Sequence, residues 1–186
     1  NSMKEFVGYA KSRPGQLSYA SFGNGSPPHL GTELLKLATG IDMVHVPYKG
    51  GAPALPDLIG GRLAAMFIDM PPVMQHIKAG RLKVLAVSTP ERTALLPNVP
   101  TVAETVPNFG FSAWFGVVAP AGSSVQVIAK LSSAIDRVLA VPEVREQLAG
   151  IGCDAVGKGP DDFSALIASE TEKWRKVIKA IGLKLD

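Results

Sequence analysis

Residues 17–38 place a β-prone run, a glycine-rich turn and a run with helical leucine spacing in direct succession. Gly23 and Gly25 allow a tight turn after a strand at 17–22, and leucines at helical spacing predict a helix over 28–38. Ser26 is expected to cap this helix, and prolines suit its first positions. Such a helix start binds anions, carboxylates included, through free N–H groups. The same pattern also occurs in ordinary strand–loop–helix connections, so both interpretations stay open.

Strand and helix patterns alternate along the first two thirds of the chain. The predicted strands are residues 17–22, 43–48, 63–68, 83–88 and 112–119. The predicted helices are residues 4–12, 28–38, 52–59, 72–78 and 102–105. Residues 82–87 form a nearly uninterrupted apolar run, which is typical of a buried parallel strand. The alternation predicts an α/β sheet covered by helices.

The pattern after Gly122 is helical. Helices are expected to begin at Ser123 or Ser124, at Pro142 and at Pro160, with a short extended segment at 154–156. The first and last of these helices carry wide apolar stripes and have almost no sheet beside them. Amphipathic helices bury their apolar face against another element, so these helices need a partner surface.

Composition narrows the classes of protein that fit. A chain of 186 residues with 46% hydrophobic residues can form one domain or two small ones. No apolar run approaches the roughly 18 residues that span a bilayer, and no leader pattern follows Met3. Cys153 is the only cysteine, so an intrachain disulfide is excluded. The net charge of +3 is spread along the chain, so no nucleic-acid partner is expected and only a weak attraction to small anions follows.

Two further predicted strand ends carry polar residues. Tyr48, Lys49 and Gly50 lie at the end of the second strand, and Asp69 follows the third. Ligands of open α/β sheets bind outside the carboxyl ends of the strands. Singly, Lys49 fits a solvated charge and Asp69 a helix cap. Together with the first loop, they offer many hydrogen-bonding groups and no evident base or nucleophile, which indicates recognition without turnover.

Catalysis and metal binding are weaker alternatives. Ser26 and His29 are the candidates for the nucleophile and base of a hydrolase or acyl-transfer enzyme, but no G-x-S-x-G turn is present. Both lie on the first turn of one predicted helix, which favours a cap and a contact to ligand or water. The three histidines are scattered without metal-ligand spacing, and His45 is expected to be structural. A purely structural or interaction role is the third alternative.

Residues 152–159 nearly match a phosphate-binding loop. Gly159 stands where the motif requires the Ser or Thr hydroxyl that binds magnesium. Asp161 and Asp162 follow in the next predicted helix, where they repel phosphate and suit the helix dipole. No cofactor is therefore predicted, and Cys153 within this segment is expected to be a small apolar filler.

Several strings, taken in order, resemble the extracytoplasmic solute receptors of tripartite tricarboxylate transporters, the Bug-type receptors. They are YASFGNGSPPHLGTELLK, HVPYKGGAPALPDLIGGRL, MFIDMPP, IKAGRLKVLAVST, LLPNVPTVAE and WFGVVAPAG, and the match runs over residues 4–186. The resemblance implies the second lobe of a two-lobe α/β fold like that of periplasmic binding proteins, which closes on a small carboxylate. It also implies a periplasmic location, membrane transporter subunits as partners and no enzyme activity.

The resemblance assigns ligand contacts to the loops. It implies roles for Ser21, Gly23, Asn24, Gly25, Ser26 and His29 in the glycine-rich loop, and for Tyr48, Lys49, Gly50 and Asp69 in the other two. Pro27 and Pro28 stand where the family often has small polar residues. Because proline has no N–H, these positions remove possible carboxylate contacts.

Family members are longer at the N-terminus, so the chain is expected to be truncated. Residues 1–122 are expected to form a ligand-binding lobe, and residues 123–186 a helical segment that normally packs on the missing first lobe. The apolar stripes of this segment, which include Trp174 and Ile178, would then lack cover. We therefore expect self-association through the C-terminal helices.

Overall fold

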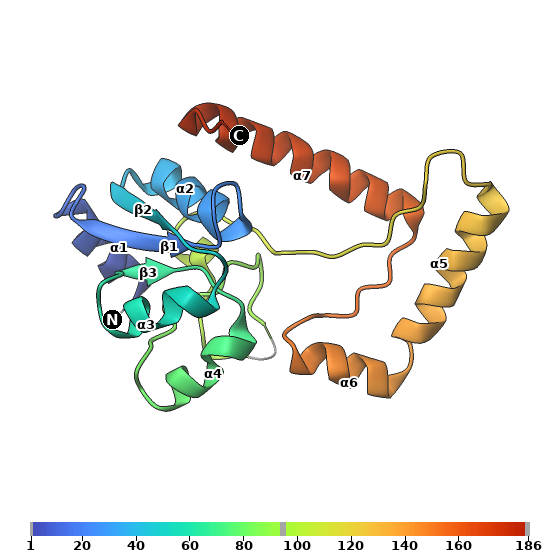
Figure 1. Cartoon of the computed structure of the whole chain (residues 1–186), viewed down its shortest axis with the longest axis horizontal. Helices are drawn as coiled ribbons and strands as arrows, with labels where there is room; N and C mark the ends of the chain where they lie inside the picture. Colours follow the sequence, from blue (N-terminus) through green and yellow to red (C-terminus); the bar gives the residue numbers. More distant parts are fainter. Residues whose placement is uncertain (1, 94–95, 185–186) are drawn as a thin grey trace. The chain divides into compact units, whose positions relative to one another are not determined.

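The computed structural model describes residues 2–93 and 96–184, and it has the predicted α/β class (Figure 1). The strands are β1 (Leu17–Ser21), β2 (Met43–Pro47) and β3 (Ala65–Met66). The helices are α1 (Met3–Lys11), α2 (Pro27–Thr39), α3 (Leu55–Ile59), α4 (Met70–Lys78), α5 (Val125–Leu139), α6 (Pro142–Gly150) and α7 (Pro160–Ile181). Two short 3-10 helices, η1 (Ala52–Ala54) and η2 (Val102–Glu104), complete the described elements.

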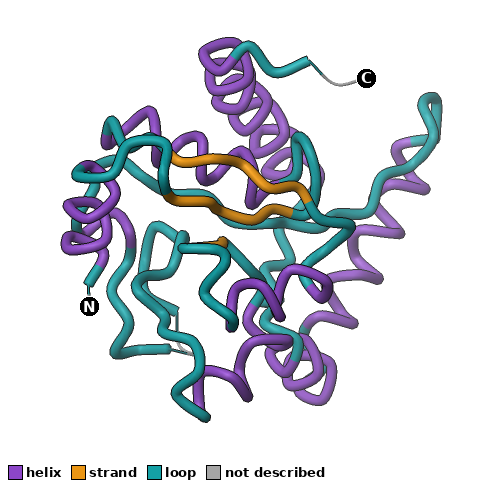
Figure 2. Tube along the Cα trace, turned by 60° about the vertical axis from the view of Figure 1, so that its left-hand side comes forward, coloured by secondary structure: helices purple, strands orange, loops and turns teal. Residues whose placement is uncertain are grey.

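The three strands form one parallel sheet in the order β2-β1-β3. Figure 2 shows β1 and β2 side by side, with Tyr19 of β1 opposite His45 of β2. The central strand is the most deeply buried part of the sheet, since Tyr19, Ala20 and Ser21 are fully inaccessible. Because all three strands run in the same direction, their carboxyl ends lie at one edge, as the sequence predicts for a ligand site.

Two of the predicted strands are wrong. Among the described residues, 83–88 and 112–119 form no strand, and Val87 makes only an isolated parallel bridge with Thr101. A strand requires a neighbouring edge with which to share hydrogen bonds. β3 contributes two residues, so the edge that it offers cannot support a further ladder. Residues 154–156, for which a short extended segment is expected, lie in a loop.

The chain divides into two compact units. Unit 1 comprises Asn1–Ala113 and Val177–Asp186, and unit 2 comprises Trp114–Lys176. The sheet lies in unit 1, together with an aromatic cluster in which Phe111 meets the rings of Phe67 and Phe109 edge-on. That residues 123–186 belong to another lobe stays a prediction.

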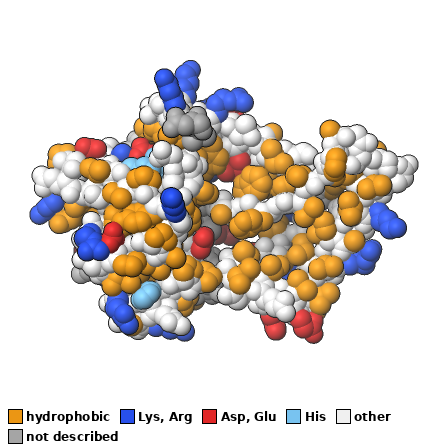
Figure 3. Space-filling model, in the orientation of Figure 1, with side chains coloured by type: hydrophobic (Ala, Val, Ile, Leu, Met, Phe, Trp, Pro, Cys, Tyr) orange, Lys and Arg blue, Asp and Glu red, His pale blue; other side chains and the backbone are white. Residues whose placement is uncertain are grey.

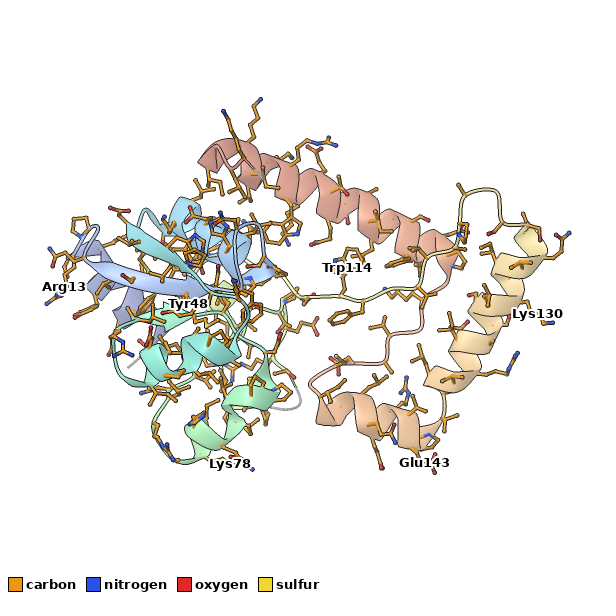
Figure 4. All side chains as sticks on the ribbon, in the orientation of Figure 1. Arg13, Tyr48, Lys78, Trp114, Lys130 and Glu143 are labelled. Atoms are coloured by element: carbon orange, nitrogen blue, oxygen red, sulfur yellow. The ribbon has the colours of Figure 1, made fainter. Side chains whose placement is uncertain are left out.

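Unit 2 exposes much apolar surface. Phe115 is 85% exposed, Val125 81% and Val138 54%, so these side chains lack the cover that a core provides. Figure 3 shows hydrophobic side chains gathered over α5, and Figure 4 shows Lys130 projecting from this helix into solvent. None of the helices in the described part of the chain is long and apolar enough to cross a membrane.

Candidate functional site

The loops after β1, β2 and β3 meet at the carboxyl edge of the sheet. The Tyr48 N–H donates to the Ser21 carbonyl at 3.0 Å, which joins the first two loops. A methyl group placed on Gly51 would lie 3.0 Å from the Phe22 ring and 3.3 Å from the Ile68 side chain. Residues from all three loops are thus in contact. The residues predicted for the site therefore lie in loops at the carboxyl edge of the sheet.

Ser21 ends β1 and fixes the start of the glycine-rich loop. Its hydroxyl accepts the Gly23 N–H at 3.1 Å and lies 2.6 Å from His45 Nε2. His45 therefore has the structural partner that its place in a strand suggests. Gly23 has φ +120°, a conformation that favours glycine, so the turn needs this residue type.

His29 lies beneath the loop. Its Nδ1 accepts the Gly25 N–H at 3.0 Å, which leaves the ring proton on Nε2. The imidazole is only 6% exposed and stacks on His45, with ring centroids 3.9 Å apart and planes within 6°. Burial lowers the pKa of His29, and burial together with the neighbouring His29 lowers the pKa of His45 to about 4. The pair is therefore neutral near pH 7, and the His29 ring supports the loop from within.

The expected cap by the Ser26 side chain is wrong. Ser26 occupies the N-cap position of α2, but its hydroxyl donates to the Gly23 carbonyl at 2.7 Å instead of accepting a helix N–H. An N-cap side chain bonds the N–H of the second or third helical residue. The second is Pro28, which has none, so the hydroxyl turns back into the loop.

The loop offers fewer free N–H groups than the sequence suggests. Gly23 and Gly25 donate to Ser21 and His29, and Pro27 and Pro28 have no N–H. Within residues 2–93 and 96–184, the backbone N–H groups of Asn24 and His29 have no intramolecular acceptor. Asn24 is also exposed. Asn24 and the backbone of His29 are thus the donors that the loop can present to an anion.

In the loop after β2, Lys49 is exposed, whereas the Tyr48 side chain is hydrogen-bonded within the protein. The Tyr48 hydroxyl, labelled in Figure 4, donates to Asp57 at 2.6 Å. Asp57 also accepts from Arg62 at 2.9 Å, and these two bonds lower the pKa of the carboxyl group. Lys49 and Asp69 are exposed, and Asp69 occupies the N-cap position of α4 without a side-chain cap bond. Lys49 is therefore the cation that this edge offers to an anionic ligand.

A buried polar network under the sheet was not anticipated from the sequence. The hydroxyl of Tyr19, fully buried, donates to Glu33 at 2.6 Å, and Lys36 donates to the same carboxylate oxygen at 2.8 Å. Burial and the bond to Glu33 raise the pKa of Tyr19. The sequence feature that could have predicted this network is Glu33, an acidic residue among the leucines of α2. A carboxylate on a buried helix face needs a hydrogen-bonding partner.

The geometry does not favour a nucleophile. Ser26 and His29 are not bonded to each other, because Ser26 donates to Gly23 and His29 accepts from Gly25. Ser21 and His45 do form a close pair, but Ser21 is fully inaccessible and no substrate carbonyl can reach it. No group of three His, Cys, Asp or Glu suited to a metal occurs among the described residues.

A protein-family model described as "Tripartite tricarboxylate transporter family receptor" matches residues 1–183. The chain belongs to this family. Protein BugT of Bordetella pertussis is 39% identical over 186 residues, which is all of this chain and 57% of that protein. The chain thus spans a little over half the length of this receptor-family relative.

Solved structures agree with the family. The structure of Rpa4515 from R. palustris with adipate has a TM-score of 0.84 at 35% identity, covering 97% of this chain and 61% of that one. The structure of MatC from Rhodopseudomonas palustris with bound malate has a TM-score of 0.80 at 29% identity, covering 96% and 62%. The predicted resemblance and the periplasmic-binding-protein type of fold are therefore confirmed.

Proposed function

We propose that this chain carries a ligand-binding lobe of an extracytoplasmic receptor for a small organic carboxylate. The observation that carries the proposal is the meeting of the three strand-end loops at one edge of a parallel sheet. Two proteins of the same fold, Rpa4515 and MatC, were determined with adipate and with malate, which supports a dicarboxylate-sized ligand.

Within this site the residues have distinct roles. Asn24 and the His29 N–H at the start of α2 donate to the carboxylate, and the Lys49 ammonium attracts it. Ser21, Gly23, Gly25 and Ser26 shape the loop from which the donors project. Tyr48, Gly50 and Asp69 belong to the same edge, where they bound the ligand or hold bridging water.

The receptor works by binding and delivery, with no turnover. Its partners are membrane subunits of a tripartite tricarboxylate-type transporter, and its location is periplasmic. Family membership supports both statements. A carboxylate bound by neutral amides and one ammonium can be released unchanged, as transport requires.

The proposal is tested by adding adipate, malate, a monocarboxylate and a tricarboxylate to the isotopically labelled chain while recording amide NMR spectra. NMR detects dissociation constants of about the millimolar range, as expected where one lobe encloses the ligand only partly. We expect at least one acid to shift the amides of Asn24 and His29 in a saturable manner. No shift with any acid, together with hydrolysis of an ester substrate, would overturn the receptor assignment.

A matched pair of glycine variants separates binding from folding. Gly25 and Gly40 have nearly the same positive φ, 73° and 71°, but only Gly25 lies in the loop. Both Gly25→Val and Gly40→Val strain the backbone, whereas only Gly25→Val should remove carboxylate binding. If the Gly40 variant loses binding to the same degree, the loss reports instability and the loop has no special role.

We further propose that the chain self-associates through its C-terminal helices. α5 carries an apolar hollow lined by Leu131, Ala134, Ile135, Val138 and Leu139. Large exposed apolar patches are unusual on monomeric proteins, and a two-fold pairing of this face would remove it from water.

A further inference from the structure

The two stacked imidazoles come from different elements and meet under the glycine-rich loop. His29 lies in the first turn of α2 and His45 in the middle of β2. Their ring centroids are 3.9 Å apart, and the Tyr19 ring stacks on His45 with centroids at 5.0 Å. Such close, nearly parallel packing fixes both rings.

Each imidazole is bonded to a different part of the loop. His29 Nδ1 accepts the N–H of Gly25, and His45 Nε2 bonds the Ser21 hydroxyl, which in turn accepts the N–H of Gly23. The two histidines thus hold both loop glycines at once. Asn24, one of the two proposed ligand donors, lies between these two anchored residues.

The groups around the pair disfavour a charged ring. Burial lowers the pKa of both histidines, and the Lys36 ammonium lowers them further. The Glu33 carboxylate acts in the opposite direction, but it is already bonded to Lys36 and to the Tyr19 hydroxyl. A proton on either ring would also lie against the other ring. Protonation of either ring is therefore disfavoured as long as this arrangement persists.

Protonation reverses the bond that holds Gly25. Nδ1 of a neutral His29 accepts the Gly25 N–H, whereas Nδ1 of an imidazolium carries a proton and can only donate. Two donors would then face each other. We propose that His29 is a positioning residue that holds the loop in its ligand-binding form while neutral and releases it on taking up a proton, and that the stacked His45 ring fixes His29 in place.

Release of the loop also releases the ligand, a consequence that rests on the proposed carboxylate function. The loop half of the proposal does not depend on any ligand. The two parts are therefore tested separately.

The effect on the loop is tested by NMR of the chain without ligand, from about pH 7.5, above the ordinary pKa of a histidine, to about pH 3, below the pKa of about 4 of His45. We expect the Gly25 amide shift and its hydrogen exchange to change with the same midpoint as the His29 ring signal. A Gly25 amide that stays unchanged while the His29 ring titrates would overturn the proposal.

Two variants distinguish positioning from general stability. His29→Asn keeps an oxygen acceptor close to the position of Nδ1 but cannot be protonated, so its Gly25 amide should stay protected across the pH range. His76→Gln removes a histidine of α4 outside the cluster and should keep the wild-type response. A pH response of Gly25 that persists in His29→Asn would contradict the proposal even if both variants are less stable.

The ligand half is tested with adipate and malate on the wild type and on His29→Asn at each pH. Comparison at equal pH cancels the ionisation of the acids themselves. We expect the wild-type affinity to fall about tenfold per pH unit below the ring midpoint, relative to the variant. Equal pH dependence in both proteins would overturn the release step. No binding at any pH would instead contradict the proposed function, and the Gly25 result would stand.

Discussion

Replacing Gly31 by alanine should destabilise the protein, although alanine is the better helix former. Gly31 is buried in α2, and an added methyl group would overlap the edge of the Phe111 ring. Phe111 cannot move aside cheaply, because the rings of Phe67 and Phe109 meet it edge-on at 5.0 and 6.0 Å. The helix gains about 1 kcal/mol from the substitution, and severe overpacking costs about 3 kcal/mol. We expect a net loss of about 2 kcal/mol.

Gly8→Ala is the matched control. Gly8 lies in the interior of α1, and nothing stands within 4 Å of an added methyl group. The free energy of unfolding of this variant should rise by up to about 1 kcal/mol, so the two Gly→Ala changes should alter stability in opposite directions. Urea unfolding followed by circular dichroism measures both, with the midpoint as readout and an unchanged m-value as the check on the transition.

A Gly31→Ala protein as stable as the wild type would refute this reasoning, because it would show that the aromatic cluster yields to the methyl group. The double variant Gly31→Ala/Phe111→Leu tests the cause. If the clash is responsible, the smaller side chain should make the alanine less costly than in the wild-type background, by a coupling of about 1 kcal/mol or more.

Four further outcomes are expected. His45 has a pKa of about 4 in the folded chain against an ordinary 6.5, so between these pH values the unfolded chain binds more protons than the folded chain. The free energy of unfolding therefore falls as the pH drops from about 6.5 to about 4. Without screening, the loss of stability is about 3 kcal/mol at 1.36 kcal/mol per pH unit, and solvent screening of the half-buried ring should reduce it to roughly half. Urea unfolding of His45→Gln and of the wild type at both pH values measures this loss. Tyr19→Phe should cost about 1–3 kcal/mol in the same assay, because Glu33 stays buried without its phenol donor. Cys153→Ala should leave stability and carboxylate shifts unchanged, because the half-buried thiol lies in a loop of unit 2, which contains none of the proposed site residues. Light scattering across a dilution series should show an association that Val138→Lys weakens, and a strictly monomeric wild type would contradict the proposed pairing.

The proposed proton response changes what the histidines contribute to a receptor. A loop built on glycines alone would be held by backbone geometry at any pH. Here the Gly25 N–H is bonded directly to the imidazole of His29. The Gly23 N–H is bonded to the Ser21 hydroxyl, which is bonded to the imidazole of His45. Under this proposal, the affinity for an anion is linked to the charge of His29, whose ring need not touch the ligand.

The sequence by itself determined the local elements and their order. Leucine spacing and the Pro27-Pro28 start predicted α2 to within one residue at each end. Gly23 and Gly25 predicted the turn before it, and both have positive φ in the structure. These features depend on neighbours within a few positions, so a single chain segment contains the needed information. The family strings likewise lie within continuous segments, which is why the resemblance was confirmed.

Only the tertiary structure decided which side chains pair. From the sequence, Ser26 and His29 were a nucleophile–base pair only as the weaker alternative, and no pairing of Ser21 with His45 or of His29 with Gly25 was predicted, although the structure has both. The predicted strand at 83–88 failed for the same reason, since a strand exists only where a neighbouring edge accepts it. Parallel pairing brings together residues such as Tyr19 and His45, 26 positions apart, and no local pattern records that register.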